Sequence, residues 1–144
     1  MNEFIRLSLT KAEKLDQDLS LINIFELIPE NNLFWSVLEF DGIGEAPFDW
    51  RMDEFTRLVL RTDGGIQLDW FELKKFILSV QETYHCLIVG AKSTELFSKD
   101  RRYKENFLDS EYVIEVFDGG ELSFFSKYSQ VNDVIESTFY HCII

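Results

Sequence analysis

Apolar and polar side chains recur at regular intervals along most of the chain, and these intervals predict its secondary structure. Apolar residues at every second position from 5 to 9 indicate a half-buried strand. Helical spacing predicts a helix from Lys11 to Ile28, although the run after residue 20 is ambiguous, and Pro29 ends it because helical backbone is disfavoured just before a proline. Residues 33–40 alternate again and predict a second strand, with odd-numbered and even-numbered side chains on opposite faces.

Between the second strand and residue 61, the sequence first predicts a loop and then a helix. Glycines and a proline between residues 41 and 49 predict a loop. Asp49 should cap a helix that begins at Trp50, because acidic residues fill its first turn and arginines follow, as suits the helix dipole. A strand through residues 55–59 is the alternative.

The clearest helical signal follows a Gly-Gly break and a short predicted strand at residues 66–68. Asp69 and Glu72 have the spacing of a capping box, and the apolar stripe behind them predicts a helix that runs to about Thr83. The nearly continuous apolar run 85–91 then predicts a strand that is buried on both faces.

The last third of the chain is typical of a β-hairpin followed by a helix. Two apolar runs, 112–117 and 122–126, flank the turn residues Asp-Gly-Gly-Glu. A two-residue turn at the glycines would place Ile114 opposite Phe125. Apolar side chains at helical spacing after Ser129 predict a closing helix.

Composition supports one compact domain that spans residues 1–144. Hydrophobic residues make up 46% of the chain and include 14 Phe, which fits a large aromatic core rather than disorder. The predicted elements then define an α+β fold, in which a mostly antiparallel sheet packs against three or four helices. No apolar stretch reaches the roughly 20 residues of a membrane helix, and the N-terminus lacks the pattern of a secretory signal. We therefore expect a cytoplasmic protein that contacts no membrane.

Acidic residues dominate the charge and are unevenly distributed. The formal net charge is −12, from 26 acidic and 14 basic residues, which argues against nucleic-acid binding because phosphates require a basic surface. Residues 15–50 contain eight acids and no Lys or Arg. One interpretation is that the acids keep the protein in solution. The other is that they attract a basic protein partner, since a field of one sign speeds the encounter with the opposite sign.

The acidic stretch with interleaved aromatic residues, 39–54, is the candidate partner-binding site. Carboxylates around an exposed aromatic side chain suit a protein interface, because Trp and Tyr dominate the residues on which binding energy depends. In the alternative interpretation, Phe48 and Trp50 belong to the core. The candidate partner-binding residues are Glu39, Asp41, Glu45, Asp49, Trp50 and Asp53.

The sequence offers little catalytic or metal-binding chemistry. The two histidines, His85 and His141, each precede a cysteine within an apolar run. Neighbouring residues of a strand point to opposite faces, so a zinc site built from such pairs is disfavoured. No Gly-x-Ser-x-Gly nucleophile motif or Asp-rich calcium loop occurs. We therefore predict no catalytic residue, no metal and no cofactor, and a protein that is not an enzyme.

A basic cluster between residues 92 and 104 suggests a second possibility. It contains five of the 14 basic residues, in a polar segment that we expect to be an exposed loop or a frayed helix. Such a cluster could bind an acidic patch on another copy of the chain. The alternative function is therefore a regulatory or assembly module that acts through self-association, as a homo-oligomer, or through a housekeeping partner. The basic residues are Lys92, Lys99, Arg101, Arg102 and Lys104.

Two segments resemble patterns found in bacterial immunity proteins of polymorphic toxin systems. They are Asp-Gly-Gly-Ile-Gln-Leu-Asp-Trp-Phe-Glu-Leu, which ends at Leu73, and Tyr-Val-Ile-Glu-Val-Phe-Asp-Gly-Gly-Glu-Leu, which ends at Leu122 and precedes the closing helix. Immunity proteins are small, acidic and cytoplasmic, and they protect the producing cell by binding a cognate toxin, often a nuclease. The resemblance implies that this chain neutralises a cationic toxin domain, and it assigns no individual residue to a site.

Overall fold

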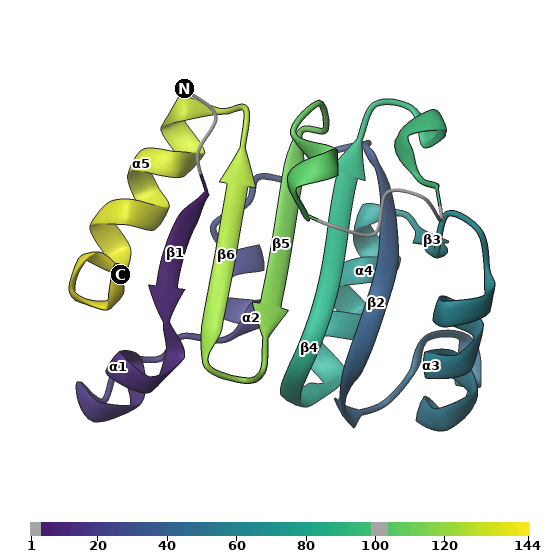
Figure 1. Cartoon of the computed structure of the whole chain (residues 1–144), viewed down its shortest axis with the longest axis horizontal. Helices are drawn as coiled ribbons and strands as arrows, with labels where there is room; N and C mark the ends of the chain where they lie inside the picture. The colour runs from purple at the N-terminus through teal and green to yellow at the C-terminus, as the bar shows by residue number, and fades with distance from the viewer. Residues whose placement is uncertain (1–3, 99–103) are drawn as a thin grey trace.

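The computed structural model describes residues 4–98 and 104–144 and has an α+β fold, as predicted. Six antiparallel strands form one sheet in the order β1-β6-β5-β4-β2-β3 (Figure 1). The strands are β1 (Ile5–Ser8), β2 (Phe34–Gly44), β3 (Ile66–Leu68), β4 (Val80–Ala91), β5 (Tyr112–Phe117) and β6 (Glu121–Ser126). The α-helices are α1 (Leu9–Lys14), α2 (Leu21–Phe25), α3 (Met52–Arg61), α4 (Trp70–Ser79) and α5 (Ser129–Thr138).

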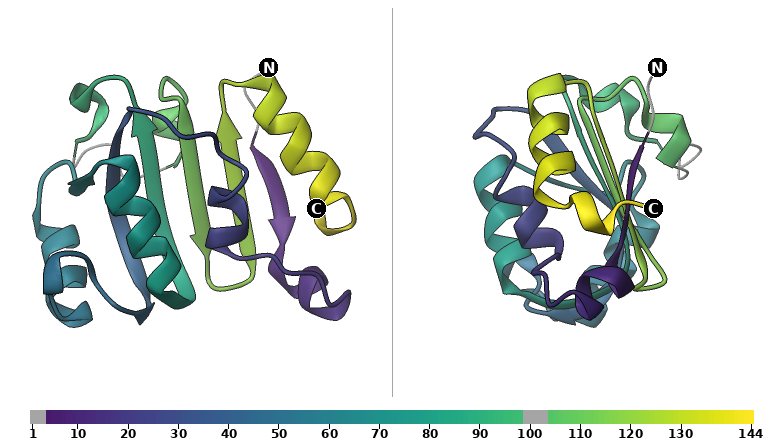
Figure 2. Two further views of the ribbon diagram at one scale, coloured as in Figure 1. Left: turned by 180° about the vertical axis from the view of Figure 1, so that it is seen from behind. Right: turned by 90° about the vertical axis from the view of Figure 1, so that its left-hand side faces the viewer.

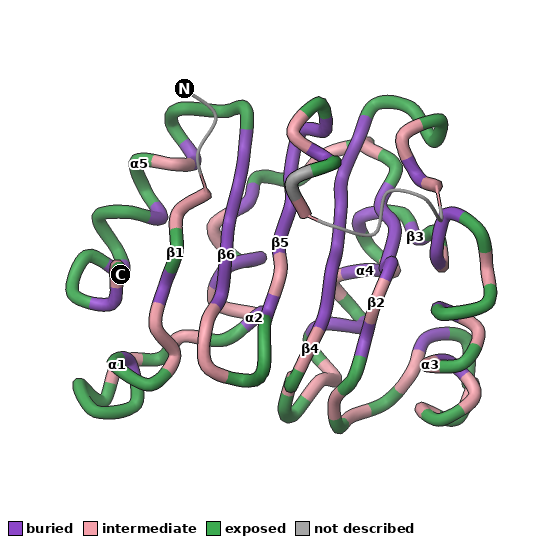
Figure 3. Tube along the Cα trace, in the orientation of Figure 1, coloured by how far each residue is buried: buried purple, intermediate pink, exposed green. Residues whose placement is uncertain are grey.

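The two faces of the sheet are covered differently. Helices α2, α4 and α5 lie on one side, and the larger core cluster fills the space beneath them (Figure 2). The opposite side carries the described parts of the connection between β4 and β5, which include the short 3-10 helices η2 (Thr94–Leu96) and η4 (Lys104–Phe107). A smaller apolar cluster around Phe107 and Phe125 lies under this segment. Near the β5–β6 turn the strands become less buried (Figure 3).

The core under the helices is built around Trp35, which is completely buried. Its ring lies 5.3 Å from that of Trp70 and 5.4 Å from that of Tyr112, measured between centroids. The indole Nε1 donates a hydrogen bond of 2.9 Å to Oδ1 of Asn31, which satisfies its buried polar group. Through further contacts of Trp35 and Tyr112 with Phe25 and Phe124, these rings form one aromatic cluster in the core.

The N-terminal helix prediction is wrong in its extent, because two short helices replace the single helix expected from Lys11 to Ile28. Helix α1 begins earlier, where the Oγ of Ser8 accepts a hydrogen bond from the amide of Lys11. It ends at Lys14, and the left-handed φ of 55° at Asp16, two residues later, is incompatible with further helix.

The loop predicted for residues 41–49 begins later than expected. Strand β2 continues to Gly44 because β4, which starts directly after α4 at Val80, extends far enough to pair with it. A bulge at Leu38 also moves Phe40 to the helix side, where it joins Trp35 in the core, whereas simple alternation places these two residues on opposite faces.

Three other sequence predictions are confirmed, with one shift in register. The capping box of Asp69 and Glu72 is present, with both hydrogen bonds formed, although α4 ends at Ser79 rather than near Thr83. Residues 55–59 are helical, in α3, but this helix begins at Met52 with Arg51 at the N-cap position, so the prediction that Asp49 caps a helix starting at Trp50 is wrong. Strands β5 and β6 form the predicted hairpin, but Ile114 pairs with Phe124 rather than with Phe125. The turn contains three residues, with Asp118 and Gly119 at positive φ, and the extra residue moves the pairing by one position.

Both edges of the sheet are short or covered. The outer side of β1 pairs with the C-terminal residues, since Leu7 bridges Ile143 and the amide of Ile144 donates to the carbonyl of Arg6 over 2.9 Å. Strand β3, at the opposite edge, has three residues. Such edges resist pairing with another sheet. Among the described residues, no helix is long and apolar enough to cross a membrane.

Candidate protein-binding surface

The structure divides the six candidate residues into two groups. Glu39 and Asp41 lie on β2 and face away from the helices, on the sheet surface that we call the open face. The other four lie in the connection between β2 and α3 or in the first turn of α3. The open face comprises Glu39, Asp41, His85, Glu115, Phe117 and Glu121.

The connection after β2, residues 45–50, is here named the Phe48 loop. Phe48 and Asp49 have φ values of 57° and 61°, so two consecutive residues other than glycine adopt the left-handed conformation. That conformation costs roughly 1–2 kcal/mol for an ordinary L-residue. The ring of Phe48 is nevertheless 55% exposed. The backbone strain therefore presents an aromatic side chain to solvent rather than burying it.

The side chain of Trp50 contacts both Phe48 in the loop and Phe55 in α3. Its ring stacks on that of Phe55 at a centroid distance of 6.2 Å, and the ring of Phe48 meets it edge-on at 5.5 Å. Trp50 is half-buried and packs against the main core. The alternative interpretation is thus right for Trp50, which packs against the core, and wrong for Phe48, which is exposed.

The acidic residues of this region differ in how far they are neutralised. Asp53 lies 3.0 Å from Arg51 and 3.6 Å from Arg57, measured between carboxylate oxygen and guanidinium nitrogen. Desolvation opposes the effect, but the hydrogen bonds and charge of Arg51 hold the pKa of Asp53 below its usual value. Within the described part of the chain, no Lys or Arg lies within ion-pair distance of Glu45 or Asp49.

A cavity of about 420 Å³ lies beside the Phe48 loop. Its other wall comes from α4 and includes Glu72, Lys75 and Phe76. Ser79 at the end of α4 donates a hydrogen bond of 2.7 Å to the carbonyl of Glu45, which ties the loop to the helix layer. This hydrogen bond therefore fixes the loop that carries the exposed ring of Phe48 and the carboxylates of Glu45 and Asp49 to the end of α4.

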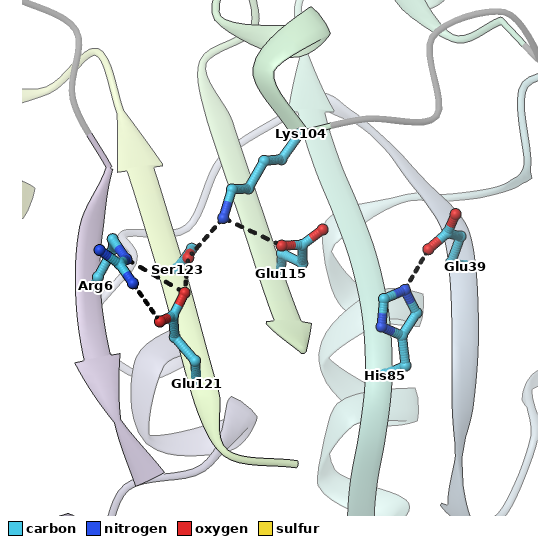
Figure 4. Close-up of polar contacts among 7 residues, drawn as sticks. All are labelled: Arg6, Glu39, His85, Lys104, Glu115, Glu121 and Ser123. Carbon is cyan, nitrogen blue, oxygen red and sulfur yellow. Dashed lines mark hydrogen bonds and ion pairs between the residues drawn. The ribbon is translucent and has the colours of Figure 1, made fainter. Parts of the chain in front are cut away.

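The open face contains a charged network that sequence reasoning missed (Figure 4). The ammonium of Lys104 lies 3.3 Å from Oε1 of Glu115 and 3.1 Å from Oγ of Ser123. The guanidinium of Arg6 lies 2.7 Å from Oε1 of Glu121. The hydrogen bond from Arg6, opposed by desolvation, lowers the pKa of Glu121. Two of the carboxylates on this face are thus paired within the molecule.

The alternation of side chains along β5 is the sequence feature that could have predicted this network. Glu115 and Phe117 are two positions apart on β5 and so share a face. The predicted two-residue turn placed Glu115 opposite an apolar residue, whereas the observed three-residue turn pairs it with Ser123. Of the predicted basic segment, Lys99, Arg101 and Arg102 lie outside the described residues, and Lys104 belongs to the network.

His85 and Cys86 do not form a nucleophilic pair. Nε2 of His85 contacts the carboxylate of Glu39 on the open face, whereas the adjacent Cys86 points into the core on the other side of the sheet. Burial raises the pKa of the Cys86 thiol to about 12, which leaves it un-ionised and unreactive at neutral pH. No group of three or more His, Cys, Asp or Glu residues within 4–98 and 104–144 could hold a metal ion.

Fold and surface together define an α+β domain that presents an exposed aromatic ring beside unpaired carboxylates. No family model, curated protein or solved structure matches the chain.

Replacing Asp49 with glycine should raise the free energy of unfolding by about 0.5–1 kcal/mol, because glycine adopts a positive φ without steric cost. The same replacement at Glu45, which lacks a positive φ, should lower it by a similar amount, because glycine adds entropy to the unfolded chain. Denaturant unfolding of both variants measures the difference. Equal changes in the same direction would show that the loop stores no strain.

Proposed function

We propose that this protein is a non-enzymatic, acidic binding protein that neutralises a cationic toxin, such as a nuclease, by covering its active surface. One observation carries the proposal: the strained Phe48 loop holds Phe48 55% exposed, beside a cavity that Glu45 and Asp49 also line. Backbone strain that does not serve packing is characteristic of functional sites. An exposed aromatic residue with a charged rim is the usual centre of a protein interface.

Charge determines what kind of partner fits this surface. The net charge of −12 and the unpaired acids of the loop favour a basic protein and repel nucleic acid. Glu39 and Asp41 add carboxylates on the open face. An inhibitor of a nucleic-acid-cleaving toxin requires a negatively charged surface, because the toxin surface that binds phosphates is basic. The resemblance to immunity proteins points to the same role.

The test compares two double variants that change the net charge equally. Glu45→Lys with Asp49→Lys reverses the loop, and Asp133→Lys with Glu136→Lys reverses two exposed acids on the outer side of α5. Each protein is immobilised and exposed to native cytosol at low and high salt, and the retained proteins are identified. We expect the wild type and the α5 variant to retain one basic protein, with salt-weakened binding, and the loop variant to lose it.

The retained protein is then purified and its toxicity assayed with increasing amounts of the wild type. Toxicity should disappear at an equimolar ratio. Phe48→Ala should weaken binding by about 2 kcal/mol or more, roughly thirtyfold, as expected for an aromatic residue at the centre of an interface. A partner that stays fully active in excess wild type, or that the loop variant retains unchanged, would overturn the proposal.

Retention of further copies of this chain alone would instead favour the assembly module. The covered edge of β1 and the short edge strand β3 argue against self-association by strand pairing. A self-association through the charged open face would be sensitive to salt. Light scattering of the purified protein across concentration and salt separates these outcomes.

A further inference from the structure

A second cavity, of about 310 Å³, lies on the helix side of the sheet, at the end that contains the β5–β6 turn. Its floor is formed by the buried side chains of Ile77, Val116 and Leu122. The cavity lies between α2, which contributes Leu21 and Ile22, and the C-terminal end of α4, which contributes Ile77. The volume falls at the lower end of the range for small-molecule sites.

The walls of the cavity are apolar and incompletely buried. Leu19 and Ile22, before and within α2, face Val80 at the start of β4, and all three are half-buried. Water in an apolar cavity makes few hydrogen bonds, so replacing it with an apolar group is favourable. The cavity therefore suits a ligand with a compact apolar body.

The mouth of the cavity carries negative charge only. Among its described lining residues Glu82 is the sole group charged at neutral pH, and no lysine, arginine or histidine belongs to them. The hydroxyl of Tyr84 donates a hydrogen bond of 2.5 Å to Glu82. That bond, with desolvation and the charges of Glu82 and Asp41, raises the pKa of Tyr84. An anionic ligand is disfavoured at this mouth, and a cationic one is favoured.

We propose that this cavity binds a small organic cation with an apolar body, such as an alkylammonium, whose chain fills the cavity while its ammonium lies beside Glu82. The site is distinct from the Phe48 loop and does not depend on the proposed toxin-binding function. It combines an apolar enclosure with one carboxylate and no competing cation among the described lining residues.

Three probes with the same chain and different head groups test the site: octylammonium, octanol and octanoate. Each is titrated below its aggregation concentration into ¹⁵N-labelled protein, and amide shifts are followed. We expect saturable shifts at Val80, Thr83 and Leu122. Octylammonium should bind about threefold tighter than octanol, and octanoate weaker by a similar factor, as expected for one solvent-exposed charge. Equal affinity for octanoate and octylammonium, or no saturable shift at these amides, would overturn the proposal.

Variants locate the site and isolate the charge. Val80→Phe fills the cavity and should abolish binding, whereas Val134→Phe makes the same change at an exposed position on α5, outside the cavity, and should leave binding unchanged. Glu82→Gln leaves the packing intact and should reduce the affinity for octylammonium to that for octanol. Thermal unfolding verifies that each variant is folded. Binding that survives Val80→Phe, or that is lost equally in both phenylalanine variants, contradicts the assignment.

Discussion

Replacing Trp35 with alanine should lower the free energy of unfolding by about 3–5 kcal/mol, the usual cost of deleting a fully buried tryptophan. The ring has no exposed surface and contacts the rings of Phe25, Trp70 and Tyr112. The side chain lies between the sheet and the helix layer, so the surroundings cannot collapse into the space. The Oδ1 of the half-buried Asn31 also loses the indole donor.

The neighbouring residue Phe34 provides a matched control, since it lies on the same strand and its ring is 50% exposed. Phe34→Ala should cost less than half as much, because about half of the ring is already in contact with water. Urea unfolding of both variants gives the comparison. Equal losses would mean that the aromatic cluster is not the centre of the core.

Replacing Gly65 with alanine should cost about 2–4 kcal/mol, for two reasons that act together. Gly65 has a φ of 71°, which an alanine tolerates poorly. An added Cβ would also overlap the carbonyl oxygen of Val37 and the Oγ of Ser36. Both neighbours are buried in β2, so they cannot move away without breaking its pairing with β3.

Gly120 is the control for this substitution. A Cβ at Gly120 meets no atom within 4 Å, and its φ lies outside the left-handed range. Gly120→Ala should therefore change the free energy of unfolding by no more than about 0.5 kcal/mol. If thermal and denaturant unfolding give the same midpoint for both alanine variants, the packing of the turn before β3 against β2 is looser than described.

Local signals predicted the elements that local interactions determine. The capping box of Asp69 and Glu72 and the apolar stripe behind it define α4 without reference to the rest of the chain. The break at Asp16 could not be predicted in this way, because apolar residues keep helical spacing across it. The break depends on the left-handed backbone of Asp16, and Leu21 and Phe25 then enter the core from a second, separate helix.

The strand faces show why a surface is harder to predict than a fold. One extra residue in the β5–β6 turn and one bulge in β2 each reverse the face assigned to a run of side chains. These two irregularities concealed the pairing of Glu115 with Ser123 and the position of Phe40 in the core. Neither has a distinctive sequence signature, since each depends on pairing between strands.

The acidic candidate residues also show that a surface is harder to predict than a fold. Composition indicated that residues 39–54 are acidic and aromatic, but it could not separate an exposed ring from a buried one. Phe48 is exposed and Trp50 half-buried, because the left-handed backbone of the loop directs two nearby aromatic rings differently. The position of the ring therefore depends on backbone conformation, which the pattern of apolar residues does not encode.

The position of β1 in the sheet has a consequence for the order of folding. Ile5, near the start of the chain, pairs with Phe124, so the sheet is completed only after a loop of almost the whole chain has closed. Closing so long a loop is entropically slower than forming the β5–β6 hairpin or α4. We expect the hairpin and the β2–β4 pair to assemble first. During synthesis, the N-terminal strand would then remain unpaired, with Leu7 exposed to solvent, until β6 has emerged from the ribosome.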